Sequence, residues 1–305
     1  MLHLLSAKRS VGTSTRKVLT MKNEIFIKKG DKIILDDTHK VICGDCLEEM
    51  KKMADNSVDV FFTSPPYNDS GTENEDVANL KSNNTHKKYE HVERHDDWFE
   101  WQCEVIDEAL RVTKKYVLYN IQAISNNRTN VYKLIGKYAD RIHDILVWNK
   151  INGSPTSTPH KISNTYEFVF ILKPDGVEGV DVKSMFYRNV ISMNINPNKD
   201  YGKIHRALMS EEFCDEIINQ FTQEGDTVLD CFNGLGTTML SCKEFGCKYI
   251  GIELSEKYCQ KTIERYLEYD MGDRNIKVIR DNDTYTYEDI KQYVQSAQTN
   301  IFDVL

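Results

Sequence analysis

Long apolar segments are absent from this 305-residue sequence. Runs such as Ile145-Leu146-Val147-Trp148 fall far short of the roughly 20 residues that a membrane-spanning helix needs. Internal repeats are lacking too, and the composition, 40% hydrophobic and 28% charged, excludes a globally disordered chain or a disulfide miniprotein. The length therefore predicts one large α/β domain or two small ones, with a sizeable core.

Paired cysteine spacings are scarce. The eight cysteines are scattered, and the only C-x-x-C runs from Cys43 to Cys46. A structural zinc site needs a second ligand pair, but Cys242 and Cys247 have four residues between them, with no His close in sequence. We predict no metal site, and buried reduced thiols in a reducing intracellular compartment.

Charge of one sign does not dominate the whole chain. The net charge of −8 divides into −1 for residues 1–149, +3 for 150–206 and −10 for 207–305. The basic middle is compatible with a DNA-binding face, whereas the acidic last third is typical of a solvated surface.

The first twenty residues are basic and contain no acid. Their Lys, Arg, Ser and Thr content resembles that of an organelle transit peptide, and the alternatives are a disordered basic arm or a translation start at Met21. We favour the latter two and leave these residues out of the fold.

Short apolar runs alternate with longer amphipathic stretches from residue 32 onward. The pattern predicts a hairpin over 32–43, strands over 58–62, 116–119, 144–148, 166–172, 227–230 and 248–252, and helices over 47–53, 98–114, 130–138, 211–220, 237–245 and 256–269. Residues 68–96 are polar and predict a long loop. This interleaving predicts a mostly parallel, doubly wound sheet.

A strand, a glycine turn, a helix and a second strand follow one another from Asp230 to Glu253. Gly234 and Gly236 allow a tight bend at a helix N-terminus, and Glu253 is placed to accept the two hydroxyls of a ribose. The unit predicts a nucleoside-containing ligand. A dinucleotide fold is the alternative, but Met239 replaces the third glycine of its fingerprint.

A second motif, Thr63-Ser64-Pro65-Pro66-Tyr67-Asn68, ends the strand predicted over 58–62. Its two prolines stop the strand. The Ser64 side chain and the Pro65 carbonyl can accept the hydrogens of a planar amine while Tyr67 stacks on the base, which draws the amine lone pair out of conjugation. A proline-ended strand with a packed Tyr is the alternative.

Together these segments resemble the β class of DNA amino-methyltransferases, which methylate the exocyclic nitrogen of cytosine or adenine with S-adenosylmethionine. The catalytic tetrapeptide corresponds to Ser64-Pro65-Pro66-Tyr67 and precedes the donor turn Asp230 to Thr238, which is the order of the β class. The resemblance runs from about Val41 to Tyr266 through Trp148-Asn149-Lys150 and Glu167-Phe168-Val169-Phe170. It implies a Rossmann-like methyltransferase fold with an antiparallel strand and a small recognition insertion.

The resemblance also implies roles for single residues. The donor would contact Asp45 and Cys46 around its adenine and Glu253 at its ribose. Its methionine part would be cradled by Phe232, Gly234, Gly236, Thr237 and Thr238, and Asp230 and Asn233 are further donor-binding residues. His205 matches a further pocket motif, whose two prolines are replaced here by Arg206 and Ser210.

The reaction implied is direct methyl transfer to an exocyclic amine of a flipped-out base. Methylation of cytosine carbon 5 would need a Pro-Cys nucleophile, and none of the six prolines precedes a cysteine. Ser at the first motif position favours cytosine N4, because a carboxylate there could be repelled by the lone pairs along the cytosine edge. Adenine N6 is the alternative; methylation of RNA or protein amides and an inactive DNA-binding relative are less favoured.

We divide the chain into a basic arm over 1–23, a catalytic half over 24–173 with a loop over 69–97, a recognition segment over 174–204, a donor-binding half over 205–270 and an extension over 271–305. The partner implied is DNA, double- or single-stranded, with Asn68, Lys87, Lys88, Arg94, Lys183, Arg188 and Lys199 as contacts. No membrane partner is predicted. The resemblance leaves open a homodimer and a cognate restriction endonuclease.

Overall fold

The computed structural model describes residues 25–67, 97–124, 127–153, 160, 162–195, 201, 204, 208–270 and 275–293. Its strands are β1 (Lys32–Ile34), β2 (His39–Cys43), β3 (Val58–Thr63), β4 (Thr113–Ile121), β5 (Ile142–Lys150), β6 (Tyr166–Leu172), β7 (Val190–Met193), β8 (Thr227–Asp230), β9 (Lys248–Glu253), β10 (Lys277–Arg280) and β11 (Asp283–Thr286). Its helices are α1 (Cys46–Lys51), α3 (Trp98–Val112), α4 (Arg128–Lys137), α5 (Glu211–Phe221), α6 (Thr237–Glu244) and α7 (Glu256–Tyr269).

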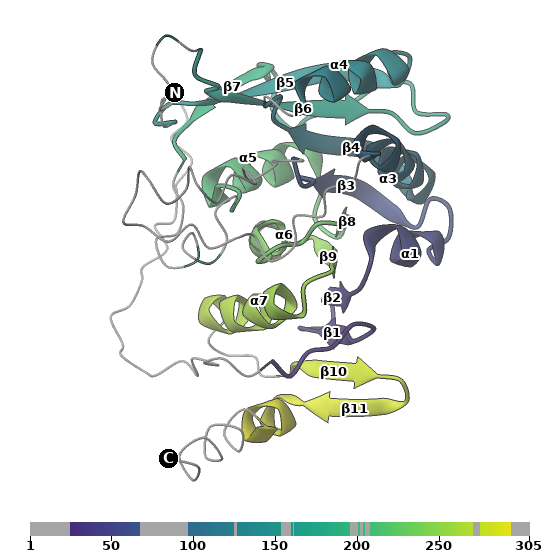
Figure 1. Ribbon diagram of the computed structural model, residues 1–305, viewed down its shortest axis with the longest axis vertical. Helices are drawn as coiled ribbons and strands as arrows, with labels where there is room; N and C mark the ends of the chain where they lie inside the picture. Colours follow the sequence, from purple (N-terminus) through teal and green to yellow (C-terminus); the bar gives the residue numbers. More distant parts are fainter. Residues whose placement is uncertain are drawn as a thin grey trace, which may run out of the picture.

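The strands form one sheet in the order β11-β10-β1-β2-β9-β8-β3-β4-β6-β5-β7 (Figure 1). Its centre, β2-β9-β8-β3-β4, is parallel throughout, while β6 pairs antiparallel with both β4 and β5. From β3 the chain continues outward to β4, and from β8 it continues in the opposite direction to β9. The boundary between β3 and β8 is therefore the topological switch point, where α/β sheets bind ligands.

Alternating side chains divide the interior into two cores. In β3, Val60 and Phe62 face one core and Phe61 faces the other; in β4, Leu118 and Tyr119 separate in the same way. These side chains are fully buried. Apolar residues on both faces of a strand are what a sheet covered on both sides requires.

The helices cover the two faces of the sheet as separate layers (Figure 1). Helices α1, α3 and α4 pack on one core, through residues such as Met50, Ile106 and Leu134. Helices α5, α6 and α7 pack on the other, through residues such as Ile217, Leu240 and Ile263. Every helix predicted from the sequence is present in the structure, with bounds shifted by a few residues.

The predicted fold class is confirmed, including the antiparallel strand, which is β6. Three strands were not predicted. β7 lies inside the segment proposed for recognition and pairs with β5, and β10 and β11 form a hairpin that joins the sheet through β1. Among the described helices, none is long and apolar enough to span a bilayer.

Candidate active site

The carboxyl ends of the five central strands lie at one edge of the sheet. Cys43 of β2 is level with Glu253 of β9, and Thr63 of β3 is level with Tyr119 of β4. Phe61 of β3 pairs with Leu229 of β8. Three segments that are far apart in sequence thus begin beside one another: Gly44 to Cys46, Ser64 to Tyr67, and Cys231 to Gly236.

Asp230 connects the two predicted motifs directly. Thr63, the residue before Ser64, donates its hydroxyl to Asp230 Oδ1 at 2.6 Å, and Thr238 Oγ1 donates to Oδ2 at 2.8 Å. The backbone N–H of Phe232 adds a third donor at 3.1 Å. Burial raises the pKa of the Asp230 carboxyl, while these hydrogen bonds favour its charged form.

The glycine turn after β8 requires residues without a side chain. Gly234 and Gly236 have φ of 54° and 73°, in the left-handed region. A Cβ on Gly236 would lie 2.9 Å from Thr262 Cγ2. Asn233 fixes the turn, because its amide donates to the Gly234 carbonyl at 3.0 Å and its Oδ1 accepts from Tyr249 OH at 2.9 Å.

Glu253 lies at the end of β9 with its carboxylate facing this turn. Its Oε2 accepts the backbone N–H of Gly234 at 2.8 Å and its Oε1 that of Ser255 at 2.8 Å. Burial nevertheless raises the pKa of Glu253 to about 7, since these donors offset only part of the desolvation. A carboxylate has about four acceptor positions, so a hydroxyl-bearing ligand finds acceptor capacity here.

The segment after β2 completes the side that is predicted to bind the donor. The N–H of Gly44 donates to the Glu253 carbonyl at 2.9 Å, and Asp45 caps helix α1 by accepting the Glu48 N–H. Cys46 is buried beside the Cys231 thiol, whose pKa is raised by burial and then by Cys46. A protonated thiol is a poor nucleophile, so Cys231 is not equipped for covalent catalysis.

The Ser-Pro-Pro-Tyr corner is held by side chains from the next elements. Trp98 of α3 donates its indole N–H to the Pro66 carbonyl at 3.0 Å. Asn127 donates to the Tyr67 carbonyl at 2.9 Å. Trp98 is 1% exposed, as expected for a packing residue. The backbone carbonyls of Pro66 and Tyr67 are thereby held in place.

Side chains from β4, β5 and β6 continue this corner. Tyr67 OH lies 3.0 Å from Ser64 Oγ and 2.9 Å from Glu167 Oε2, and Asn120 Nδ2 lies 2.6 Å from the same carboxylate oxygen. Lys150 pairs with the other oxygen, Oε1. Burial, followed by the Glu167 charge, raises the pKa of the Tyr67 phenol well above its usual value.

Sequence reasoning assigned no role to Asn120, Lys150 and Glu167. A signal was available, because each is a polar residue at or next to the end of an apolar strand. Trp101, half-buried on α3, is a further neighbour: its ring contacts Phe232 of the donor turn edge to face at 5.6 Å.

The predicted DNA contacts are less well placed. Arg188 and Lys183 are exposed, but the Lys183 N–H donates to the Gln220 carbonyl at the end of α5, near the amino end of β8. The structure therefore puts Lys183 at the edge opposite the site. Several other predicted residues lie outside the described residues: Asn68, Lys87, Lys88, Arg94, Lys199 and His205.

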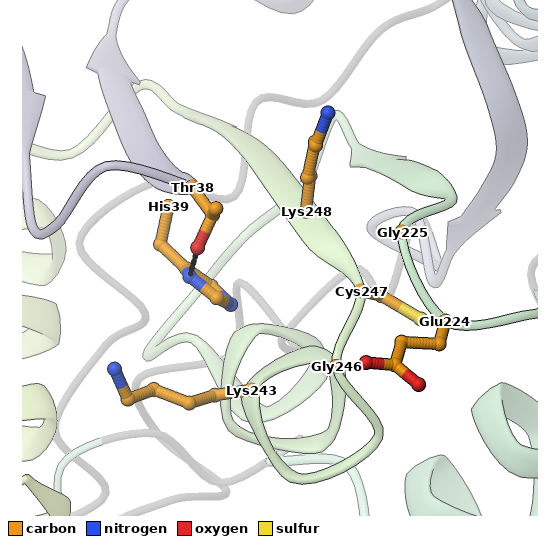
Figure 2. Close-up of a pocket in the computed structure, with 8 residues that line it drawn as sticks. All are labelled: Thr38, His39, Glu224, Gly225, Lys243, Gly246, Cys247 and Lys248. Atoms are coloured by element: carbon orange, nitrogen blue, oxygen red, sulfur yellow. Dashed lines mark hydrogen bonds between the residues drawn. The ribbon is translucent and has the colours of Figure 1, made fainter.

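The same opposite edge carries a hollow of about 700 Å³ (Figure 2). It is lined by residues at the amino ends of β2 and β9, such as His39 and Lys248, and by Lys243 of α6. None of the strand-end residues described above lines it, so it is separate from the candidate site. Within the described residues there is no cluster of His, Cys, Asp and Glu that would hold a metal ion.

Comparison with known proteins assigns the chain to a family. The family model N6_N4_Mtase, described as DNA methylase, matches residues 58–264. This chain belongs to that family. The Type II methyltransferase M.BamHI of Bacillus amyloliquefaciens is 26% identical over 289 residues, which cover 82% of this chain and 63% of that relative.

Solved structures of DNA methyltransferases share the fold. PvuII DNA methyltransferase (cytosine-N4-specific) superimposes with a TM-score of 0.57 at 16% identity, covering 85% of this chain and 92% of its own. The M1.HpyAVI–SAM complex gives 0.52 at 20% identity, covering 74% and 99%. The predicted resemblance and the dependence of the family on S-adenosylmethionine are thus confirmed.

Proposed function

We propose that this DNA methylase transfers a methyl group from S-adenosylmethionine to the exocyclic N4 of a cytosine in DNA. The carrying observation is the 2.6 Å hydrogen bond between Thr63 and Asp230, together with the β3–β8 pairing. It places the Ser64 corner against the glycine turn, so that an amine held at one motif faces a donor held at the other.

The donor side fits an adenosyl ligand by its chemistry. Glu253 offers a buried carboxylate to ribose hydroxyls, Gly234 and Gly236 keep the turn free of Cβ atoms, and Asp45 and Cys46 border the position proposed for the adenine. Phe232, Asn233, Thr237 and Thr238 complete the cradle in this proposal. When bound, S-adenosylmethionine supplies an electrophilic methyl group on its sulfonium sulfur.

The corner residues then act on the base. Ser64 Oγ and the Pro65 carbonyl accept the two hydrogens of the amine, and the Tyr67 ring stacks on the flipped base, which offsets part of the few kcal/mol of flipping. Held by these two acceptors, the amine nitrogen would accept the methyl group that the bound donor supplies. It would then release one proton to solvent.

Cytosine is favoured over adenine by the neutral hydroxyl of Ser64. A carboxylate there could be repelled by the N3 and O2 lone pairs of cytosine, whereas a hydroxyl accepts one hydrogen bond without that charge.

All eight cysteines are unpaired thiols, which supports a reducing compartment that contains DNA. The homodimer and the paired endonuclease stay predictions.

Nucleoside mass spectrometry of DNA treated with enzyme and labelled donor tests the proposal. We expect labelled N4-methylcytosine from the wild-type protein and much less from Ser64→Ala. Labelled N6-methyladenine would instead show that the target is the exocyclic N6 of adenine. Unlabelled DNA together with labelled RNA or protein would overturn the proposal.

A further inference from the structure

Five side chains around the Ser64 corner form one continuous hydrogen-bonded chain. Glu167 Oε1 is taken by Lys150, and Glu167 Oε2 is shared by Tyr67 OH at 2.9 Å and Asn120 Nδ2 at 2.6 Å. Ser64 Oγ lies 3.0 Å from Tyr67 OH and 3.3 Å from Asn120 Nδ2. Glu167 is 6% exposed and Asn120 1%, so bulk water does not compete freely for these contacts.

The chemistry of the groups fixes the direction of each hydrogen. A carboxylate can only accept, so Tyr67 donates its single hydroxyl hydrogen to Glu167. Tyr67 then has only lone pairs for Ser64, and Ser64 donates to Tyr67. Asn120 Nδ2 also lies 3.3 Å from Ser64 Oγ and 3.4 Å from Tyr67 OH, so Ser64 accepts at most one hydrogen from its second N–H. At least one lone pair of Ser64 Oγ is left over, and it can accept a hydrogen from an incoming amine.

We propose that Glu167 is a positioning residue for methyl transfer, whose carboxylate acts through Tyr67 to leave Ser64 Oγ as an acceptor for the target amine. This inference rests on the proposed amine methylation and explains what orients the Ser64 hydroxyl. Lys150 contributes by holding Oε1, so that Oε2 stays available to Tyr67. The lysine is itself placed by Trp148, with its Nζ 5.2 Å from the indole centroid.

A merely structural ion pair would behave differently. Lys150 and Glu167 could neutralise each other without any contact to Tyr67, and a buried pair of that kind is often replaceable by apolar residues. The second carboxylate oxygen is instead committed to the catalytic corner through both Tyr67 and Asn120. The burial that raises the pKa of Tyr67 keeps its hydroxyl protonated as the donor to Glu167.

A double-mutant cycle tests the chain of donors. In Glu167→Gln, Lys150 attracts the amide oxygen, so the amide NH₂ faces Tyr67 and reverses the direction of donation. Tyr67→Phe keeps the ring for stacking and removes only the hydroxyl. We expect each variant to slow single-turnover methyl transfer roughly 10- to 100-fold with unchanged donor affinity, and the double variant to be within about threefold of the slower single one.

A matched control exists between α3 and the end of α4. Tyr138 donates its hydroxyl to Asp107 at 2.8 Å, and Asp107 lies 3.8 Å from Lys137, which repeats the tyrosine–carboxylate–lysine chemistry without a serine. Tyr138→Phe and Asp107→Asn should leave the transfer rate within about twofold of wild type. A loss equal to that at Tyr67 and Glu167 would assign the effect to general destabilisation and overturn the proposal.

A second readout uses the protein without donor or DNA. The ¹³Cζ resonance of Tyr67 in tyrosine-labelled protein, assigned by its loss in Tyr67→Phe, should shift in Glu167→Gln and stay in place in Asp107→Asn. An unmoved resonance, or additive losses in the cycle, would refute the role of Glu167 while leaving amine methylation intact. A wild-type protein that methylates no DNA amine would instead remove the proposed function.

Discussion

The two halves of the strand-end site are built in different ways. On the side proposed for the donor, backbone N–H groups carry much of the contact. Those of Phe232, Gly234 and Ser255 donate to the carboxylates of Asp230 and Glu253, beside the hydroxyls of Thr63 and Thr238. On the base side, side chains contact side chains, as Ser64, Tyr67, Asn120, Lys150 and Glu167 do. The donor half depends on backbone shape, and the base half on the position of protons.

This contrast separates binding from rate. A substitution that changes the path of the backbone at the glycine turn should weaken donor binding, because the N–H groups lose their direction. A substitution that removes a hydroxyl or a carboxylate at the corner should leave the pocket intact and slow the reaction, because only the transition state uses those groups fully. Variants on each side therefore test the distinction.

The largest effect is expected at Gly236. Valine there would have to adopt φ of 73°, with its Cβ 2.9 Å from Thr262 Cγ2 and 3.1 Å from Met239 Cε. We expect Gly236→Val to weaken donor binding by roughly 100-fold or more, since strain of order 1–3 kcal/mol adds to the displaced turn. Isothermal titration with S-adenosylmethionine measures it.

Gly179→Val is the matched control for that experiment. No atom lies within 4 Å of a Cβ placed on Gly179, which is exposed and lies in the segment between β6 and β7. It should bind the donor like wild type. Normal donor affinity in a folded Gly236→Val variant would show that the pocket lies elsewhere.

A smaller effect is expected at Ser64, on the rate of methyl transfer and not on donor binding. Ser64→Ala removes the acceptor proposed for the target amine but leaves Asp230, Glu253 and the glycine turn unaltered. Single-turnover methylation should slow by about 100-fold, the range for loss of one hydrogen bond in a preorganised site, while donor affinity stays within about twofold. A variant that loses donor affinity as strongly as rate would contradict the separation of the two halves.

The same contrast explains what could be predicted from the sequence. The residues of the glycine turn are close together in sequence. Gly234, Gly236 and Glu253 could therefore be predicted from a single strand-turn-helix-strand pattern. The tetrapeptide proposed as catalytic could be predicted because two prolines end an apolar strand. The central strands and helices α1, α3, α4, α5, α6 and α7 followed from periodicity, since each buries a regular face in one of the two cores.

The remaining features depend on pairing over long sequence distances. Glu167 contacts Tyr67 across 100 positions and Asn120 across 47, and no local pattern records those contacts. β7, β10 and β11 have only four residues each. One residue is buried in β7, one in β10 and none in β11, so these strands are too short to show the apolar alternation that marked the other strands. The placement of Lys183 follows from the path after β6, which the antiparallel pairing directs to the amino edge.

The smallest effect expected is a pH dependence of the donor half. The pKa of Glu253 is raised by burial to about 7 in the free protein, whereas ribose hydroxyls that donate hydrogen bonds favour its ionised form. Donor binding should therefore tighten by up to about tenfold between pH 6 and pH 8. Titration calorimetry across this range measures it, with Glu253→Gln as the control that should show a flat profile.

The stability of the free protein should fall as the pH rises, over a lower pH range than the change in donor binding. Because the folded state holds the Glu253 proton up to about pH 7 and an unfolded chain releases it near 4.5, folding binds a proton between these values. The contribution of Glu253 to stability is then fully present below pH 4.5 and is lost as the pH rises towards 7. Thermal unfolding of wild type and Glu253→Gln should diverge in this window. Parallel curves would mean that Glu253 is already ionised without ligand, and that its burial does not couple donor binding to pH.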